Sequence, residues 1–281
     1  MRTVTTAAAL AEALEEFRSD GERIALVPTM GALHDGHLSL VRLARGKARR
    51  VVVSLFVNPK QFGPAEDLDR YPRDLEGDSA KLAAEGVDLL FAPPVEEVYP
   101  PGFSTTVRVA GVSEGMEGAR RPGHFDGVAT VVTRLFCLVL PDVAVFGAKD
   151  GQQVAVVRRL LLDLGLPIEL AVGETVRHPD GLALSSRNAY LSAAERAAAP
   201  VLYRALSAAR DLFEDRDERD AAALLSAART VLDAEPALRL DALDLVDAAT
   251  MRPVDRVEAP VMLAAAAFLG RTRLIDNVVF G

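Results

Sequence analysis

The segment Val27–His37 reads VPTMGALHDGH, and it predicts the end of a strand, a turn and the start of a helix. An apolar run over Arg23–Val27 leads into it, and Gly36–Lys47 follows with apolar residues at helical spacing. The next segment, Arg50–Val57 (RVVVSLFV), is almost continuously apolar, which is typical of a parallel strand covered on both faces. Strand, helix and strand in this order predict a right-handed βαβ unit.

The alternation continues along the chain and predicts a doubly wound parallel, Rossmann-like α/β sheet over residues 1–175. Further helices are expected at Thr6–Arg18, Asp78–Glu85, Asp126–Leu140 and Gln152–Leu164, and further strands at Val87–Phe91, Ser104–Val109, Val143–Phe146 and Ile168–Val172. After about Gly173 the pattern changes, which predicts a smaller α+β domain over residues 176–281. Its expected helices are Ala193–Phe213 and Arg219–Ala234, and its expected strands are Leu240–Val246, Val261–Ala267 and Arg273–Phe280.

Composition narrows the class of protein. The chain has 281 residues, of which 50% are hydrophobic, and its net charge of −8 argues against nucleic-acid or membrane-surface partners. The single cysteine, Cys137, excludes an intrachain disulfide, and we expect it to be buried on a helix. No signal-peptide core is recognisable and no apolar run reaches the roughly 20 residues of a membrane span. These features predict a cytoplasmic protein.

Two of the four histidines, His34 and His37, lie at the predicted strand-to-helix turn. Ligands of doubly wound sheets bind beyond the carboxyl ends of the strands, and a helix N-terminus favours phosphate. Gly31 and Gly36 allow the backbone to approach a ligand closely. The alternatives are a surface turn with incidental histidines, or a zinc site, which lacks nearby cysteine or a glutamate-bearing helix.

Three other clusters follow predicted strands or turns. FGAKDGQQ (Phe146–Gln153) holds Lys149, one of only four lysines, and Asp150, which could also be a simple helix cap. LSSRN (Leu184–Asn188) combines two hydroxyls with an arginine, which suits phosphate but is also common in turns. NPKQFG (Asn58–Gly63) places Gln61, a donor and acceptor suited to a hydroxy acid, near the end of a buried strand. Self-capping of the loop is the alternative for Gln61.

Taken together, these motifs resemble the pantothenate synthetase family of the HxGH nucleotidyltransferase group, over nearly the whole chain. The segments that carry the resemblance are PTMGALHDGH, FVNPKQFGPAEDLDRYPR, RPGHFDGVATVV, FGAKDGQQ, DGLALSSRNAYLS and TRLIDN. The resemblance implies an ATP-dependent ligase that joins (R)-pantoate to β-alanine through pantoyl adenylate and releases pyrophosphate and AMP. It also implies Mg²⁺ and a homodimer.

The resemblance assigns roles residue by residue. It places His37, His34, Lys149 and Arg187 in catalysis, with Gln61 and Gln153 on pantoate and Asp78 on the metal. Some members of the family carry an acidic pair at the metal, where this chain has Gly77 and Asp78. The implied ATP contacts are Met30, Gly31, Ala32, Leu33, His34, Asp35, Gly36, His37, Gly147, Ala148, Lys149, Asp150, Val176, Leu184, Ser185, Ser186 and Arg187.

Because water would destroy an acyl adenylate, a cover is expected over the site. The charged segment 63–77 is one candidate, and the smaller domain over residues 176–281, which carries Leu184–Arg187, is a second lid that could close from the other side. His124 either helps to order this region or is a structural histidine. Two other functions stay open: a nucleotidyltransferase that acts on a phosphate ester, and a non-catalytic nucleotide-binding module. The glutamines disfavour the first, because a phosphorylated acceptor would call for Arg or Lys near Gln61.

Overall fold

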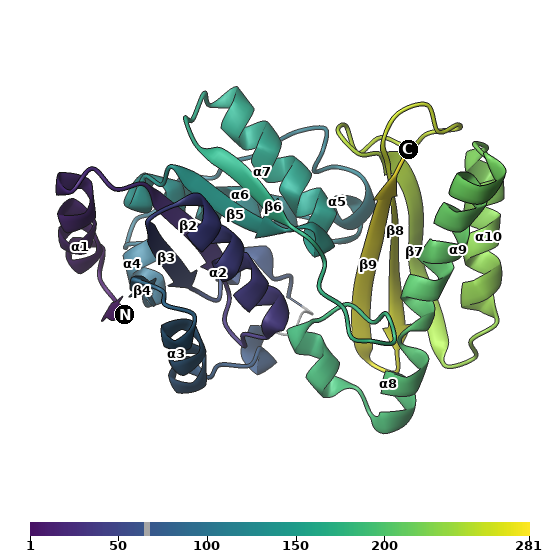
Figure 1. The fold of residues 1–281 in the computed structure, drawn as a ribbon, viewed down its shortest axis with the longest axis horizontal. Helices are drawn as coiled ribbons and strands as arrows, with labels where there is room; N and C mark the ends of the chain where they lie inside the picture. Colours follow the sequence, from purple (N-terminus) through teal and green to yellow (C-terminus); the bar gives the residue numbers. More distant parts are fainter. Residues whose placement is uncertain (65–67) are drawn as a thin grey trace. The chain divides into compact units, whose positions relative to one another are not determined.

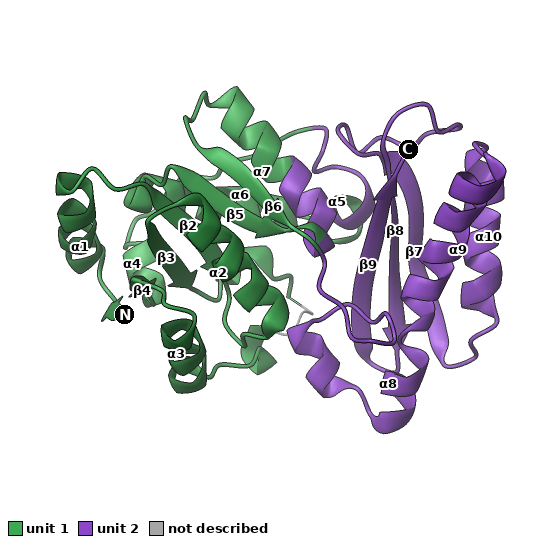
Figure 2. Ribbon diagram, viewed as in Figure 1, with its two compact units in different colours: residues 1–110, 118–148, 156–174 green, residues 111–117, 149–155, 175–281 purple. Residues whose placement is uncertain are grey.

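The computed structural model describes residues 1–64 and 68–281 and divides into two compact units (Figures 1 and 2). Unit 1 consists of residues 1–110, 118–148 and 156–174, and unit 2 consists of residues 111–117, 149–155 and 175–281. The division is therefore interleaved. The boundary expected after residue 175 lies next to the start of the longest segment of unit 2, and two short segments from earlier in the chain also belong to that unit.

Unit 1 is built on a six-stranded sheet in the order β1-β4-β3-β2-β5-β6, and all of its strand pairs are parallel. This confirms the predicted doubly wound parallel fold. The strands are β1 (Arg2–Val4), β2 (Ile24–Thr29), β3 (Arg50–Leu55), β4 (Leu89–Phe91), β5 (Val143–Gly147) and β6 (Glu169–Gly173). Its helices are α1 (Ala7–Ser19), α2 (Asp35–Lys47), α3 (Leu75–Ala84), α4 (Val95–Val98) and α6 (His124–Val139), with 3-10 turns η1 (Pro59–Gln61) and η2 (Leu68–Arg70). The 3-10 turn η3 (Ala148–Asp150) and helix α7 (Gly151–Asp163) are shared, since residues 149–155 belong to unit 2.

The centre of this sheet is a topological switch point. Strand β2 pairs with β3 on one side and with β5 on the other, so the connections leave in opposite directions. The register that pairs Leu26 with Ala144 brings Thr29 level with Gly147. The segments that follow these two residues therefore leave the sheet at the same edge, which is the usual ligand position in such folds.

Apolar patterning explains why β2 and α2 form here. Four consecutive residues of β2 are fully buried, and α2 turns Leu38, Val41 and Ala44 into the same core cluster. Each large aliphatic side chain buried in this way contributes about 1.5–3 kcal/mol. The helix ends with Arg45 and Lys47 in its last turn, where cations complement the helix dipole.

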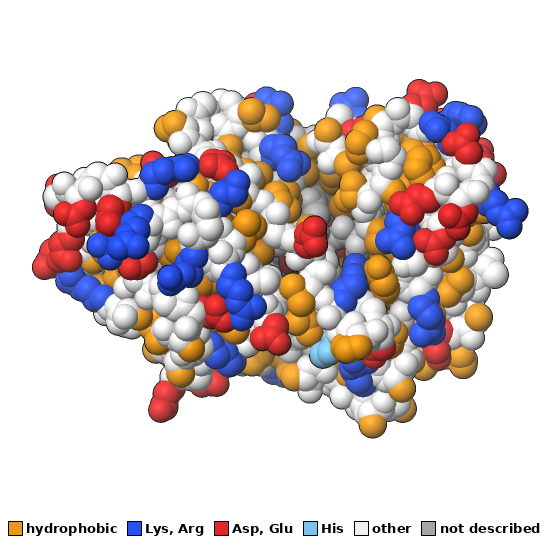
Figure 3. Space-filling model, viewed as in Figure 1, with side chains coloured by type: hydrophobic (Ala, Val, Ile, Leu, Met, Phe, Trp, Pro, Cys, Tyr) orange, Lys and Arg blue, Asp and Glu red, His pale blue; other side chains and the backbone are white. Residues whose placement is uncertain are grey.

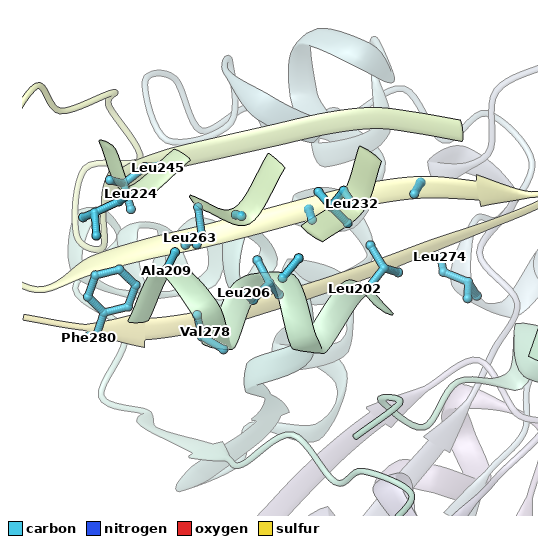
Figure 4. Packing of buried hydrophobic residues seen from close by; sticks show 14 of the residues in the cluster. Leu202, Leu206, Ala209, Leu224, Leu232, Leu245, Leu263, Leu274, Val278 and Phe280 are labelled. Carbon is cyan, nitrogen blue, oxygen red and sulfur yellow. The ribbon is translucent and has the colours of Figure 1, made fainter. Parts of the chain in front are cut away.

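Unit 2 contains a three-stranded antiparallel sheet in the order β7-β8-β9, which confirms the smaller α+β part. Its strands are β7 (Leu238–Asp247), β8 (Val261–Leu269) and β9 (Thr272–Phe280), and its helices are α8 (Ala193–Ala198), α9 (Val201–Arg216) and α10 (Ala221–Asp233), with η4 at Ser186–Tyr190. The short helix α5 (Met116–Arg120) lies at the junction of segments assigned to the two units. Figure 4 shows Leu206 of α9 on the side of Leu263 and Val278 of the sheet and Leu202 toward Leu274, all within one buried cluster.

Three local predictions were wrong. Residues 104–109 form no strand; instead, the Val107 amide donates to the Thr130 hydroxyl of α6 at 2.9 Å. The helix expected over Ala193–Phe213 is two helices, because Pro200 lacks the N–H that would continue the first one. Cys137 is exposed, since it lies on the solvent side of α6 while Phe136 faces the interior. The sequence reading also missed β1, a three-residue strand that pairs with β4.

Among the described residues, none of the helices combines the length and the apolar character needed to cross a membrane. Figure 3 shows acidic and basic side chains interspersed on the face that it draws.

Candidate active site

Apart from Asp78, which lies on α3 of unit 1, the predicted site residues fall into two groups, one in each unit. Cluster 1, in unit 1, consists of Met30–His37, Gln61, Gly147 and Ala148. Cluster 2, in unit 2, consists of Lys149, Asp150, Gln153, Val176 and Leu184–Arg187.

The loop from β2 to α2 in cluster 1 has an unusual backbone. Gly31 and Ala32 both have positive φ, at 86° and 52°, and a Cβ built on Gly31 would lie 3.1 Å from an Asp78 oxygen. The two carboxylate oxygens of Asp78 accept hydrogen bonds from the amides of Ala32 at 2.7 Å and Leu33 at 2.8 Å. One buried carboxylate therefore fixes two consecutive peptide units.

Lys81, one turn further along α3, completes this anchor. Its ammonium donates to the Leu33 carbonyl at 2.8 Å and lies 3.6 Å from Asp78. The side chain of Asp78 is only 1% exposed, and both of its oxygens are engaged. A magnesium ligand has to offer an open oxygen to an ion that keeps several waters, so Asp78 does not fit the metal role predicted for it. Among the described residues, no group of three or more His, Cys, Asp or Glu side chains could hold a metal ion.

The two histidines begin helix α2 and brace each other. His34 is the N-cap, and its Nδ1 accepts from the Gly36 amide at 3.2 Å, while Nδ1 of His37 accepts from the His34 amide at 3.3 Å. The ring centroids are 4.1 Å apart. Because each Nδ1 is an acceptor, a neutral ring carries its proton on Nε2. The local sequence thus forms a reciprocal cap from imidazoles and makes each Nε2–H a donor.

Gln61 ends the 3-10 turn η1 and is held by an extended polar network. Asn58 Nδ2 donates to Gln61 Oε1 and to the Gly127 carbonyl, each at 3.1 Å, and the Tyr99 hydroxyl donates to Asn58 Oδ1 at 2.8 Å. Burial raises the pKa of Tyr99 well above its ordinary value, which keeps this donor protonated. The backbone carbonyl of Gln61 lies 2.8 Å from His124 Nδ1.

Close packing against α6 also fixes η1. A Cβ added to Gly127 of α6 would lie 2.3 Å from the Lys60 carbonyl oxygen, so only glycine allows this approach. Of the segment expected to cover the site, residues 65–67 lie outside the described residues.

In cluster 2, the segment that starts with Lys149 lies against the antiparallel sheet. Asn277 of β9 donates through Nδ2 to the Lys149 carbonyl at 2.8 Å. A Cβ on Gly151 would lie 2.4 Å from the Met262 sulfur, so this position has no room for a side chain. The buried Gln152 bonds to the carbonyls of Val112 and Gly115, each at 2.9 Å. These contacts fix the turn that carries Lys149, Asp150 and Gln153.

The second segment of cluster 2 is a hairpin-like loop that leads into η4. The Leu184 amide donates to the Val176 carbonyl at 2.9 Å, and Arg177 pairs with Ala183 in an isolated bridge. Ser185 caps η4 by accepting from the Arg187 amide at 3.3 Å. Val176, Leu184, Ser185, Ser186 and Arg187 are all half-buried.

In unit 1, a parallel sheet carries a histidine-capped helix at its switch point, which is an arrangement typical of nucleotide-binding α/β proteins. The family description Pantoate-beta-alanine ligase matches residues 2–279, and the chain belongs to this family. It is therefore a ligase of pantothenate biosynthesis, with pantoate and β-alanine as the partners that it joins.

Individual relatives support the assignment. A pantothenate synthetase of Stutzerimonas stutzeri is 53% identical over 281 residues, covering 99% of this chain and 98% of the relative. The crystal structure of pantothenate synthetase from Thermus thermophilus matches with a TM-score of 0.94 at 53% identity, covering 99% of each chain. A pantoate-beta-alanine ligase from Francisella tularensis, solved with beta-gamma ATP and beta-alanine, matches with a TM-score of 0.81 at 31% identity, covering 99% of this chain and 97% of that one.

Sequence reasoning missed the residues that hold the site in place. Asn58 lies inside the quoted NPKQFG segment, and Asn277 lies inside TRLIDN, yet neither has a role in the sequence reading. Lys81 is one of the four lysines, and their rarity was the signal that could have identified it. No periodicity marks Asn277, because its partner Lys149 is 128 residues away.

Proposed function

We propose that the chain makes pantothenate in two steps. In the first, a carboxylate oxygen of (R)-pantoate attacks the α-phosphorus of ATP, and the bond to the leaving pyrophosphate breaks. In the second, the amine of β-alanine attacks the acyl carbon of pantoyl adenylate. AMP leaves with the electron pair of the acyl C–O bond, and the amine nitrogen gives up a proton.

The observation that carries this proposal is the paired histidine cap. Two backbone amides occupy Nδ1 of His34 and Nδ1 of His37, and the rings are 4.1 Å apart. Two neighbouring Nε2–H donors beside a helix N-terminus suit the oxygens of a triphosphate. Such fixed donors stabilise the charge that grows on the phosphate oxygens as pyrophosphate leaves, and each contributes about 3–4 kcal/mol to the barrier reduction.

The other site residues have complementary roles in this proposal. Lys149 and Arg187 supply positive charge to the phosphates, and Asp150 contacts the ribose. Gln61 and Gln153 orient pantoate by hydrogen bonds and leave its carboxylate charged and nucleophilic. The remaining ATP contacts come from Met30–Leu33, Asp35, Gly36, Gly147, Ala148, Val176 and Leu184–Ser186.

Magnesium enters this scheme as part of the substrate, bound to the phosphates of ATP. The closed environment of Asp78 supports this assignment, because both oxygens of its carboxylate already accept from backbone amides. We also propose that the protein is a cytoplasmic homodimer with small-molecule substrates, and without nucleic-acid or membrane partners. The net charge of −8 and the resemblance support these assignments.

The test is a product analysis of the purified chain with ATP, pantoate and β-alanine. AMP and pyrophosphate are expected, and exchange of labelled pyrophosphate into ATP should require pantoate and not β-alanine. ADP and phosphate as products would contradict the adenylate route. Exchange supported by a phosphate ester in place of pantoate would favour the nucleotidyltransferase alternative. Light scattering of the same sample measures the oligomeric state.

A further inference from the structure

Strand β9 carries two adjacent buried polar residues, Asp276 and Asn277, which are 3% and 8% exposed. They belong to the TRLIDN segment, to which the reaction gives no role. The strand lies at the edge of its sheet, and its neighbours Leu274 and Val278 are ordinary core residues. Burying a carboxylate and an amide costs free energy unless both are hydrogen-bonded, so the partners of these two side chains indicate what they do.

Asp276 holds the loop that leads to the serine–arginine segment. Its two oxygens accept from Arg177 Nη1 at 2.5 Å and Nη2 at 2.9 Å. The same guanidinium donates to the Gly181 carbonyl at 3.1 Å and stacks 3.8 Å from the Tyr203 ring centroid. Arg177 is therefore fixed in a planar, bidentate arrangement that an equally charged lysine could not reproduce.

Through Arg177, this pairing reaches the predicted ATP contacts on either side. Val176 precedes Arg177 directly, and the Leu184 amide closes the loop onto the Val176 carbonyl. Asn188 Nδ2 then donates to the Ala183 carbonyl at 3.1 Å, and η4 packs against β9. The backbone from residue 176 to residue 188 is thus held in place relative to Asp276 of β9.

Asn277 holds the other segment of cluster 2, by its bond to the Lys149 carbonyl. Successive side chains of a strand point to opposite faces. Asp276 shares its face with the core residues Leu274 and Val278, and Asn277 lies on the other face, where a Cβ built on Gly151 would lie 3.4 Å from its side-chain nitrogen. One strand therefore holds one ATP-binding segment on each of its faces.

We propose that Asp276 and Asn277 are positioning residues for adenylate formation. Asp276 sets the 176–187 loop through Arg177, and Asn277 sets the Lys149 turn through its carbonyl. The inference depends on the function proposed above, because it assumes that both segments bind ATP. Reacting groups tolerate displacements of only about 0.5 Å, so a shift of the strand would disturb both segments together.

The test compares Asn277→Ala and Asp276→Asn with the wild-type chain in pantoate-dependent exchange of pyrophosphate into ATP. Each variant is expected to lose about tenfold in kcat/KM for ATP, because misplaced groups lose transition-state stabilisation. Asp241→Asn is the matched control, since Asp241 of β7 pairs with Arg273, which lies outside both segments. The control is expected to stay within about twofold of wild type.

A double-mutant cycle separates positioning from general stability. If Asn277 acts by placing Lys149, then Asn277→Ala should cost about tenfold in the wild-type background and about twofold or less in the Lys149→Ala background. Equal factors in both backgrounds would overturn the proposal for Asn277. For Asp276, amide hydrogen exchange of residues 177–187 should accelerate in the folded Asp276→Asn variant and not in Asp241→Asn. If Asp276→Asn does not fold, Arg177→Lys is measured in its place by the same two methods.

The two levels of inference fail differently. A wild-type chain without pantoate-dependent exchange would overturn the proposed function. An active wild type and an impaired Lys149→Ala variant, together with unchanged Asn277→Ala and Asp276→Asn variants, would overturn the positioning role alone.

Discussion

Clusters 1 and 2 each present polar groups from a loop, but the loops are held in contrasting ways. In cluster 1 a single carboxylate, Asp78, binds the loop backbone directly, from 45–46 residues away along the chain. In cluster 2 the anchors are Asp276 and Asn277 of β9. Asp276 acts through the side chain of Arg177, 99 residues away along the chain, and Asn277 binds the carbonyl of Lys149, 128 residues away. The loop conformation in cluster 1 therefore depends mainly on one residue, whereas in cluster 2 it depends on several. Substitutions should therefore have sharper local effects in cluster 1.

The largest effect on activity is expected for His37 of cluster 1. His37→Ala removes one Nε2–H donor and should lower the exchange rate by about 10²–10³, the usual cost of a lost transition-state donor. His37→Gln is the matched variant, because a glutamine at this helix position preserves the reciprocal cap while removing the imidazole. The melting temperature of His37→Gln should stay close to that of the wild type by calorimetry, whereas that of His37→Ala should be slightly lower, because it loses the acceptor for the His34 amide. A His37→Gln variant with the wild-type rate would remove the imidazole from the mechanism.

Asp78→Ala is the strongest structural test of cluster 1. It leaves the amides of Ala32 and Leu33 buried without acceptors, at a cost of about 1–3 kcal/mol for each. We expect a free energy of unfolding lower by about 3 kcal/mol in urea titration, together with an exchange rate lower by about 10²-fold, since the loop that precedes both histidines loses its anchor.

Asp78→Asn should retain part of both properties, because one acceptor oxygen remains. The dependence of activity on Mg²⁺ distinguishes this anchor from a metal ligand. In the anchoring role, the magnesium concentration at half-maximal rate stays unchanged in Asp78→Asn. A large increase in that concentration would return Asp78 to the metal role.

The contrast between the clusters also explains what the sequence could and could not predict. The histidines, Lys149 and the Leu184–Arg187 segment follow strand ends or turns, and their residue types indicate phosphate chemistry. The parallel sheet followed from the apolar runs at β2 and β3. The residues that hold the loops, Asp78 and Asn277, have no such local signal. The burial of Asp78 depends on where α3 packs, and the role of Asn277 depends on a hydrogen-bond partner far along the chain.

Pantoate binding is expected to be the next most sensitive property. Asn58→Ala removes the donor to Gln61 Oε1 and leaves the Tyr99 hydroxyl without its acceptor. The KM for pantoate should rise by roughly tenfold, about the value of one lost buried hydrogen bond, while the KM for ATP changes little. Tyr99→Phe breaks only the outer bond of this network and should show a smaller increase. Equal increases in both Michaelis constants would show that Asn58 acts on the fold in general.

The smallest effects concern the positive-φ residues of the two loops, where the clusters differ again. Cluster 1 places Ala32 at a φ of 52°, whereas the loop of cluster 2 places Gly181 at 93°. Ala32→Gly removes a steric cost of about 1–2 kcal/mol and adds some chain entropy to the unfolded state, so the protein should gain up to about 1 kcal/mol. Gly181→Ala should instead destabilise, because its Cβ would lie 2.5 Å from the Tyr203 ring, on which Arg177 stacks. Calorimetry of the two variants measures both signs. A stabilised Gly181→Ala variant would mean that the Tyr203 ring can move at no cost in stability. The contact from Asp276 through Arg177 would then tolerate more movement than its bidentate geometry indicates.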